Sequence, residues 1–152
     1  MNIEDLYQEI ILDHYKAKHH SGLREPYEAE VHHVNPSCGD ELTLRVHVDD
    51  GIVTDVSYQA QGCSISQASS SVMSDLVIGK PVSDGLELHD EFLTMMQSKG
   101  AYEPDEERLE DAIAFAGVAR FPVRVKCALL GWSAFKDAAL RAGANGWTQE
   151  RD

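Results

Sequence analysis

The segment from residue 41 to residue 60 constrains the fold more than any other part of the chain. Its first half reads ELTLRVHV, in which apolar and polar residues alternate with the period of two that is typical of a half-buried strand. Asp49-Asp50-Gly51 follows and predicts a tight hairpin turn. In the returning strand we expect one face to carry Ile52, Val56, Tyr58 and Ala60. The opposite face would carry Asp55, Ser57 and Gln59.

The remaining periodic segments predict one more strand and several helices. The strand lies around 28–34, and helices are expected at 65–79, 90–97, 105–116 and 124–141. A first helix, capped by Asn2, would carry Ile3, Leu6, Tyr7, Ile10 and Ile11 on one side. Because an antiparallel sheet with one dry face needs helices across it, we predict an α+β fold. It has a three-stranded antiparallel sheet covered by helices and a helical insertion before the last helix.

The length of 152 residues fits a single domain over 1–152, with 143–152 as a flexible tail. The formal net charge of −13 argues against nucleic acid as a partner, because so acidic a surface repels phosphate. Residues 81–119 hold ten acids and two bases, so we interpret this insertion as a solvated helical segment with one apolar edge. The chain shows neither a secretory signal nor a membrane span, which indicates a cytoplasmic protein.

Three cysteines, Cys38, Cys63 and Cys127, each lie at a boundary between predicted elements. An odd count in a cytoplasmic chain favours free thiols or metal ligands over disulfides. Cys63 and Cys127 would lie near helix N-termini, which favour thiolates. Together with Asp40 the three thiols could form a tetrahedral zinc shell, whereas soft sulfur ligands do not suit calcium or magnesium. The sequence has no C-x-x-C pair, and one or more of the thiols filling the core is the alternative.

Three motifs in order carry a resemblance to a known family. They are Cys38-Gly39-Asp40, Gly62-Cys63 before a serine-rich helix, and RFPVRVKCALLGW around Cys127. With them the chain resembles the U-type (IscU/NifU N-terminal-like) iron–sulfur cluster assembly proteins. Two features are similar to the SufU-like branch: Lys126, where the scaffold members carry histidine, and the acidic insertion that includes FLTMMQSKG.

The resemblance implies a zinc-dependent sulfurtransferase that works with a pyridoxal-phosphate-dependent, SufS-like cysteine desulfurase and supplies the downstream iron–sulfur assembly machinery. By the family pattern the zinc ligands would be Cys38, Asp40, Cys63 and Cys127, and Cys38 would be the catalytic thiol that accepts persulfide sulfur. Two alternatives stay open. One is a scaffold that holds a [2Fe–2S] cluster on the same residues. The other is a domain in which zinc serves folding alone.

Two further groups of residues have a plain and a functional interpretation. Arg120, Arg124 and Lys126 form a basic cluster that would dock the desulfurase, or would simply be favourable surface charge. The pairs His19-His20 and His32-His33 are interpreted as surface or capping residues and not as ligands, because adjacent residues on a strand point to opposite faces.

Overall fold

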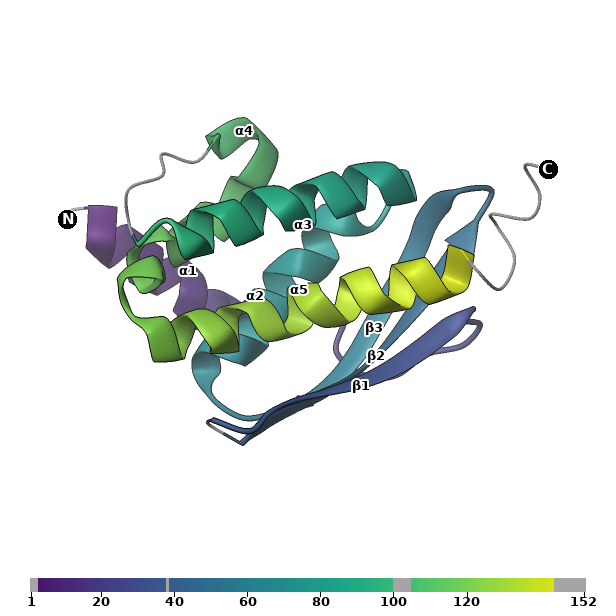
Figure 1. Cartoon of the computed structure of the whole chain (residues 1–152), viewed down its shortest axis with the longest axis horizontal. Helices are drawn as coiled ribbons and strands as arrows, with labels where there is room; N and C mark the ends of the chain where they lie inside the picture. Colours follow the sequence, from purple (N-terminus) through teal and green to yellow (C-terminus); the bar gives the residue numbers. More distant parts are fainter. Residues whose placement is uncertain (1–2, 38, 100–104, 144–152) are drawn as a thin grey trace.

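The computed structural model describes residues 3–37, 39–99 and 105–143, and over these residues it confirms the predicted α+β class (Figure 1). Three antiparallel strands in the order β1-β2-β3 form one sheet, and helices pack on one of its faces. The elements are α1 (Ile3–Ala17), β1 (Ala29–Asn35), β2 (Asp40–Asp49), β3 (Ile52–Gln61), α2 (Ser64–Val77), α3 (Val82–Gln97), α4 (Glu106–Leu109), the 3-10 helix η1 (Glu110–Arg120) and α5 (Pro122–Ala142).

The hairpin between β2 and β3 turns where the sequence predicts. Asp49 pairs with Ile52, and both intervening residues have positive φ, 52° at Asp50 and 77° at Gly51, as a primed turn requires. The expected inward face of β3 is wrong at its start, because the register shifts just after His47. This irregularity turns Val53 inward, fully buried, and leaves Ile52 37% exposed.

The polar face of β3 is partly covered as well, by the segment that joins α1 to β1. Arg24 in this segment donates its backbone N–H to Ser57 Oγ and its guanidinium to both carboxylate oxygens of Asp55. Ser57 is therefore buried, although alternation had placed it on the exposed face. The hydrogen bond from Arg24 is the main reason that the pKa of Asp55 lies below its ordinary value.

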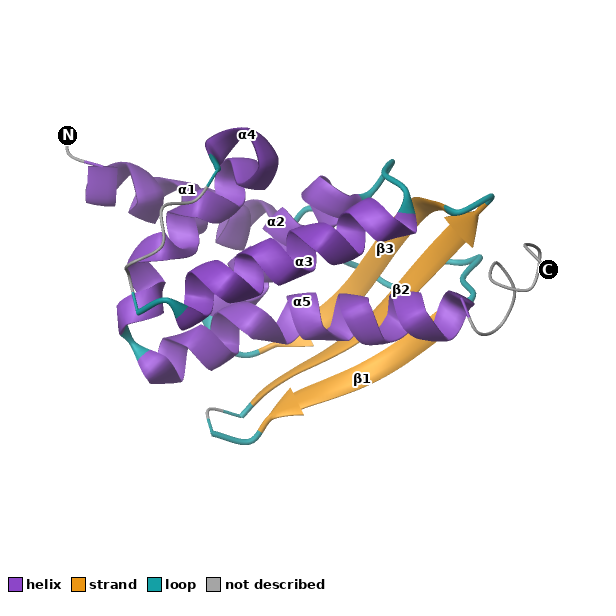
Figure 2. Cartoon of the chain, turned by 45° about the horizontal axis from the view of Figure 1, so that its top comes forward, coloured by secondary structure: helices purple, strands orange, loops and turns teal. Residues whose placement is uncertain are grey.

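Two helices of the helical layer, α5 and α2, contact the sheet most extensively. The long helix α5 runs over β1 and β2, and α2 packs against both α5 and β3 (Figure 2). Of the expected apolar positions of α5, Ala128, Trp132, Phe135 and Ala139 are fully buried. One part of the core thus lies between the inward face of the sheet and these two helices.

The acidic insertion differs from its predicted form in three ways. Helix α3 begins directly after Pro81, eight residues before the expected start, because proline favours the beginning of a helix and cannot continue an earlier one. Residues 110–120 form a 3-10 helix instead of an α-helix, since Glu110 at φ 46° interrupts the α-helical path. The insertion also joins the core: the Phe92 ring stacks on Trp132 at 5.0 Å and meets Phe115 edge-on at 6.0 Å.

Helix α1 lies at one side of the helical layer, packed on α2 and η1. Its fully buried residue is His14, whereas Ile3 and Leu6 remain 58% and 43% exposed, so its apolar stripe contributes little to the core. The proposed cap Asn2 lies outside the described residues, as does the tail from residue 144 onward. None of the helices described here has the length and apolar character of a membrane span.

Candidate metal centre

The turn from β1 into β2 and the start of α2 bring Asp40 and Cys63 together. Asp40 is the first residue of β2 and is only 1% exposed. One of its oxygens, Oδ1, accepts the backbone N–H of Cys63 at 2.9 Å, and the other, Oδ2, lies 3.4 Å from Cys63 Sγ. The buried carboxylate of Asp40 thus fixes both the backbone and the thiol of Cys63.

Cys63 is the N-cap residue of α2, with φ −73° and ψ 165°. The expected position at a helix N-terminus is confirmed for this thiol. Its Sγ also lies 3.9 Å from Ser66 Oγ, and that hydroxyl donates to the Cys63 carbonyl at 3.1 Å. In both side-chain contacts the thiol is the donor, to Asp40 Oδ2 and to Ser66 Oγ, and a metal ion bound there would take the place of its proton.

The serine-rich face of α2 explains how α5 comes close enough to supply a further thiol. A Cβ atom at Gly131 of α5 would lie 2.5 Å from Ser70 Oγ, so glycine and serine together permit a close helix contact. Across the same interface, the buried hydroxyl of Ser69 donates to the Ala128 carbonyl at 2.6 Å. The residue next to Ala128 is Cys127, so this hydrogen bond holds it opposite α2.

Cys127 is 4% exposed and lies in the second turn of α5, because the helix begins at Pro122. The prediction that Cys127 opens the last helix is therefore wrong by about one turn. Its Sγ lies 3.7 Å from the Val123 carbonyl, inside the helical ladder and not at its free amides. The thiol is positioned by packing, and the first turn of α5 extends past it.

Asp40, Cys63 and Cys127 each offer a ligand atom, and these atoms all lie within 4.8 Å of one another. Zinc bonds of about 2.3 Å to sulfur and 2.0 Å to oxygen at tetrahedral angles place such ligand atoms about 3.5 Å apart. The 3.4 Å separation between Asp40 Oδ2 and Cys63 Sγ matches this value. The donor set of one carboxylate and two thiols thus fits a metal ion of the zinc type.

The predicted fourth ligand, Cys38, lies outside the described residues. Its chain neighbours Ser37 and Gly39 belong to the turn between β1 and β2. Asn35 fixes this turn, with its side chain accepting from Ser37 N–H at 3.2 Å and its carbonyl accepting from Gly39 N–H at 2.9 Å. Gly39 has φ 75°, which confirms that this position needs the freedom of glycine. The role of Cys38 stays a prediction.

The basic cluster lies at the surface, in the residues that precede Cys127. Arg120 ends η1, and Arg124 and Lys126 belong to the first turns of α5; all three are exposed. No carboxylate of the described residues forms an ion pair with them. The guanidinium of Arg124 lies 5.3 Å from the ring centre of Phe121, which is itself 51% exposed.

The two histidine pairs behave differently. His32 and His33 point to opposite faces of β1 as predicted, the first to Thr43 and the second to Asp137 of α5. The hydrogen bond from His33 is the main cause of the lowered pKa of Asp137. His19 and His20 lie after α1, not on a strand, and both bond to the carboxylate of Asp75. The strand argument does not apply to this second pair.

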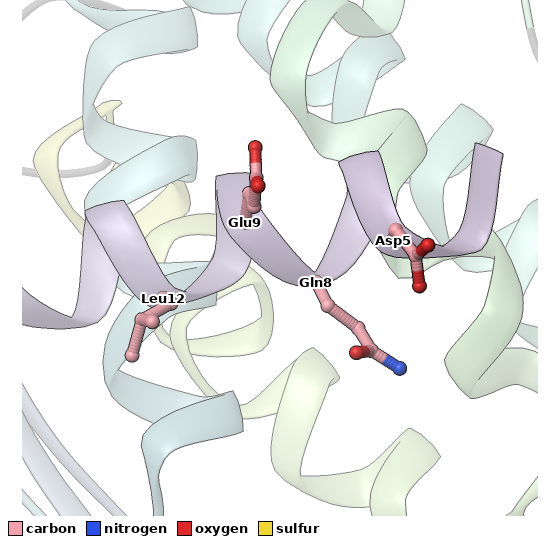
Figure 3. A pocket seen from close by; sticks show the side chains of 4 residues that line it. All are labelled: Asp5, Gln8, Glu9 and Leu12. Carbon is pink, nitrogen blue, oxygen red and sulfur yellow. The ribbon is translucent and has the colours of Figure 1, made fainter. Parts of the chain in front are cut away.

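Two hollows lie along α1, away from the thiols. One of about 400 Å³ is lined by Asp5, Gln8, Glu9 and Leu12, whose side chains project from the outer side of the helix (Figure 3). The other, of about 230 Å³, lies at the C-terminal end of α1 and includes His14 and His19. Neither is lined by Asp40, Cys63 or Cys127.

The comparisons with known proteins agree with the family that the three sequence motifs and their order indicated. The family model for the NifU-like N terminal domain matches residues 6–128, which include Asp40, Cys63 and Cys127. The chain belongs to this NifU-like N-terminal family. The expected resemblance to the U-type proteins is thereby confirmed, and this is a family of iron–sulfur cluster assembly.

Individual relatives within the NifU-like family divide between two functions. An "Iron-sulfur cluster assembly scaffold protein IscU" of Streptococcus pyogenes serotype M1 is 42% identical over 140 residues, 92% of this chain and 86% of the relative. The "Zinc-dependent sulfurtransferase SufU" of Bacillus subtilis (strain 168) is 39% identical over 146 residues, 95% of this chain and 97% of the relative. Among solved structures, a nitrogen-fixing NifU-like protein (N-terminal) from Brucella abortus has a TM-score of 0.84 at 26% identity, covering 95% of this chain and 99% of that one.

Proposed function

We propose that this protein is a zinc-dependent sulfurtransferase that accepts persulfide sulfur from a SufS-like cysteine desulfurase for iron–sulfur cluster assembly. The observation that carries the proposal is the composition of the donor set. Asp40, Cys63 and Cys127 meet without any histidine among the described residues near them. The scaffold resemblance calls for a histidine directly before Cys127, and the residue there is the exposed Lys126.

The donor set itself supports an exchangeable metal. Zinc sites that serve structure alone are closed by cysteine and histidine, whereas here a carboxylate completes the set. Asp40 already holds the Cys63 backbone, so its orientation does not depend on the metal. When bound, zinc would keep its sulfur ligands deprotonated at neutral pH. Two described thiols and Asp40 would hold it, with Cys38 as the fourth ligand.

The sulfur-accepting thiol of the proposal is Cys38. Its thiolate attacks the outer sulfur of the desulfurase persulfide, a new S–S bond forms on Cys38, and the old S–S bond breaks. The desulfurase cysteine leaves as a thiolate, so atoms and electrons balance without an oxidant. Of the two described thiols, Cys127 is buried in α5 and Cys63 contacts Asp40. The proposal therefore assigns the attacking thiol to Cys38.

The scaffold remains the second candidate, favoured by the 42% identity to the Streptococcus pyogenes scaffold protein. In this case the same thiols and Asp40 would hold a [2Fe–2S] cluster. Iron and acid-labile sulfide would then copurify with the protein under anaerobic conditions. The substitution Lys126→His should increase this cluster content if the missing histidine is what separates the two functions.

The test measures sulfide release from cysteine by the cognate desulfurase under reductant. Zinc-loaded wild type is compared with Cys38→Ala, and Ser37→Ala serves as the control for the same turn. We expect the wild type and the control to stimulate turnover and Cys38→Ala to fail. Mass spectrometry of a reaction without reductant should find the added sulfur on Cys38. If the wild type fails to stimulate turnover and carries iron and sulfide instead, the scaffold assignment replaces the sulfurtransferase.

A further inference from the structure

Histidine and aspartate side chains cluster where the end of α1 meets α2 and η1, away from the thiols. His14, the buried residue of α1, lies at the centre and is 5% exposed. Its Nδ1 is 2.8 Å from Ser71 Oγ, and its Nε2 is 2.9 Å from Asp111 Oδ2. Both ring nitrogens are therefore engaged, which fixes the orientation of the ring.

A second carboxylate, Asp75, contacts both His19 and His20 next to His14. His19 Nδ1 lies 2.6 Å from Asp75 Oδ2, and His20 Nε2 lies 2.9 Å from Asp75 Oδ1. The rings of His14 and His19 are 4.9 Å apart in an edge-to-face arrangement. Three elements that are distant in the sequence thus supply one compact set of nitrogen and oxygen donors.

The backbone of His19 is held independently of its ring. Its N–H donates to Ser71 Oγ at 2.9 Å, and its carbonyl accepts from the Tyr58 hydroxyl at 2.9 Å. Ser71 contacts His14 as well, so one buried hydroxyl on α2 aligns both histidines. Ligands held in this way lose little conformational freedom when an ion binds.

We propose that His14, His19 and Asp75 form a second metal site, for a divalent transition ion such as zinc. Each offers one ligand atom, and these atoms lie within 4.8 Å of one another. His14 and His19 line the hollow of about 230 Å³ at the end of α1, which leaves room for water to complete the coordination. Two imidazoles and a carboxylate suit zinc, nickel, cobalt or ferrous ions, and do not suit calcium or magnesium.

Neighbouring groups supply the outer contacts that such a site needs. Ser71 and Asp111 hold the two ring nitrogens of His14, so one of these two hydrogen bonds gives way when the ion binds and the other keeps the ring oriented, while His20 holds the second oxygen of Asp75. The His19–Asp75 contact must open from 2.6 Å to about 3.3 Å, the separation of nitrogen and oxygen on tetrahedral zinc. A turn of one exposed side chain achieves this, and the ion then takes the place of the hydrogen bond between His19 Nδ1 and Asp75 Oδ2.

The proposed site is separate from the thiol site. Both Cys63 and Asp75 belong to α2 or its cap, and at about 1.5 Å of rise per residue they lie about 18 Å apart along the helix. One ion cannot use both sets of ligands. The second site therefore does not depend on whether the thiols carry sulfur or a cluster. It also revises the interpretation of His19 as a simple surface residue.

The test is a zinc titration of the full-length protein, followed by the ring ¹⁵N signals of the histidines and by metal analysis after gel filtration. Variants His19→Gln and Asp75→Asn remove ligands, and both positions are exposed enough to tolerate the change. His32→Gln is the matched control, because His32 is an exposed histidine that bonds to Thr43.

We expect the wild type to bind more zinc than the thiol site accounts for, with the ring signals of His14 and His19 shifting and that of His32 unchanged. His19→Gln and Asp75→Asn should each lose the additional zinc, keep the thiol-bound zinc and remain folded. His32→Gln should bind as the wild type does. If zinc beyond the thiol site is not retained, or is retained equally by the two variants, the proposal is overturned. The proposal would also be overturned, without any variant, if the ring signals of His14 and His19 in the wild type do not shift when zinc is added.

Discussion

A Cβ atom at Gly62 would lie 2.0 Å from Asp40 Oδ1, closer than any two such atoms can approach. The carboxylate occupies this space because it accepts the backbone N–H of Cys63 at 2.9 Å. Gly62 also has φ 141°, a conformation that side-chain-bearing residues rarely adopt. The bare backbone before Cys63 is thus a condition for the Asp40–Cys63 contact, and Gly62 is part of the candidate metal centre together with these two residues.

The substitution Gly62→Ala should displace Asp40 and weaken metal binding. Strain at this φ together with the clash should lower the free energy of unfolding by about 1–3 kcal/mol. Zinc content after gel filtration and chemical denaturation measure the two effects. Gly117→Ala is the control, because a Cβ there meets no atom within 4 Å. Zinc retention by Gly62→Ala equal to that of the control would show that Asp40 is not held by this contact.

Arg124 of the basic cluster should contribute to docking and not to metal binding. The substitution Arg124→Ala should raise the concentration needed for half-maximal desulfurase activation by about 5- to 10-fold, which corresponds to about 1–1.4 kcal/mol. Zinc content should stay unchanged, because the side chain is exposed and is not among the donors that the structure brings together. Titration of the desulfurase with each variant gives the half-maximal concentrations.

The control for Arg124 is Arg141→Ala at the other end of the same helix, where the guanidinium pairs with Asp137 at 2.8 Å. This change removes the same charge from the protein but not from the neighbourhood of the thiols. Equal activation curves for the two variants would assign the basic cluster to general surface charge.

Local patterns in the sequence predicted the parts of the fold that depend on neighbouring residues. The alternation in ELTLRVHV and the Asp50-Gly51 turn gave the β2–β3 hairpin, because strand period and turn chemistry are properties of short segments. The observed hairpin also returns Asp40 and Cys63 to one end of the sheet, where their side chains meet. The motif around Cys127 added the third described member of the site.

The features that sequence reasoning missed arise from contacts between distant segments. The bulge that turns Val53 inward changes which residues face the core, and alternation alone does not reveal it. The joint approach of His19 and His20 to Asp75 depends on how α1 docks on α2. The apolar edge expected for the insertion is part of the core, and its depth could not be read from net charge, which does not describe the packing of a residue such as Phe92.

The packing of the insertion gives a prediction about stability. Phe92→Ala should lower the free energy of unfolding by about 3–5 kcal/mol, because the fully buried ring fills the space between Trp132 and Phe115. Leu140→Ala on α5, where the leucine is 53% exposed, should cost no more than about 0.5 kcal/mol. Urea denaturation followed by circular dichroism measures both. A loss of free energy of unfolding as small as that of Leu140→Ala would show that the insertion is a solvated segment, as its charge suggested.

The ion pair between Arg24 and Asp55 predicts how stability depends on pH. Arg24 donates to both carboxylate oxygens at 3.0 Å, and this hydrogen bonding lowers the pKa of Asp55 in the folded protein. A depressed folded pKa adds stability that is fully present above the unfolded value of about 3.9 and is lost as the pH falls through the folded value.

Asp55→Asn should therefore be less stable than the wild type by about 0.5–1 kcal/mol at pH 7. The gap should close as the pH falls below about 4 and the wild-type carboxylate takes up its proton. Asp49→Asn, an exposed carboxylate of the same hairpin without an ion pair among the described residues, controls for the change in net charge. Urea denaturation across this pH range measures the gap, and a constant difference at all pH values would show that Arg24 holds Asp55 no better than it holds asparagine.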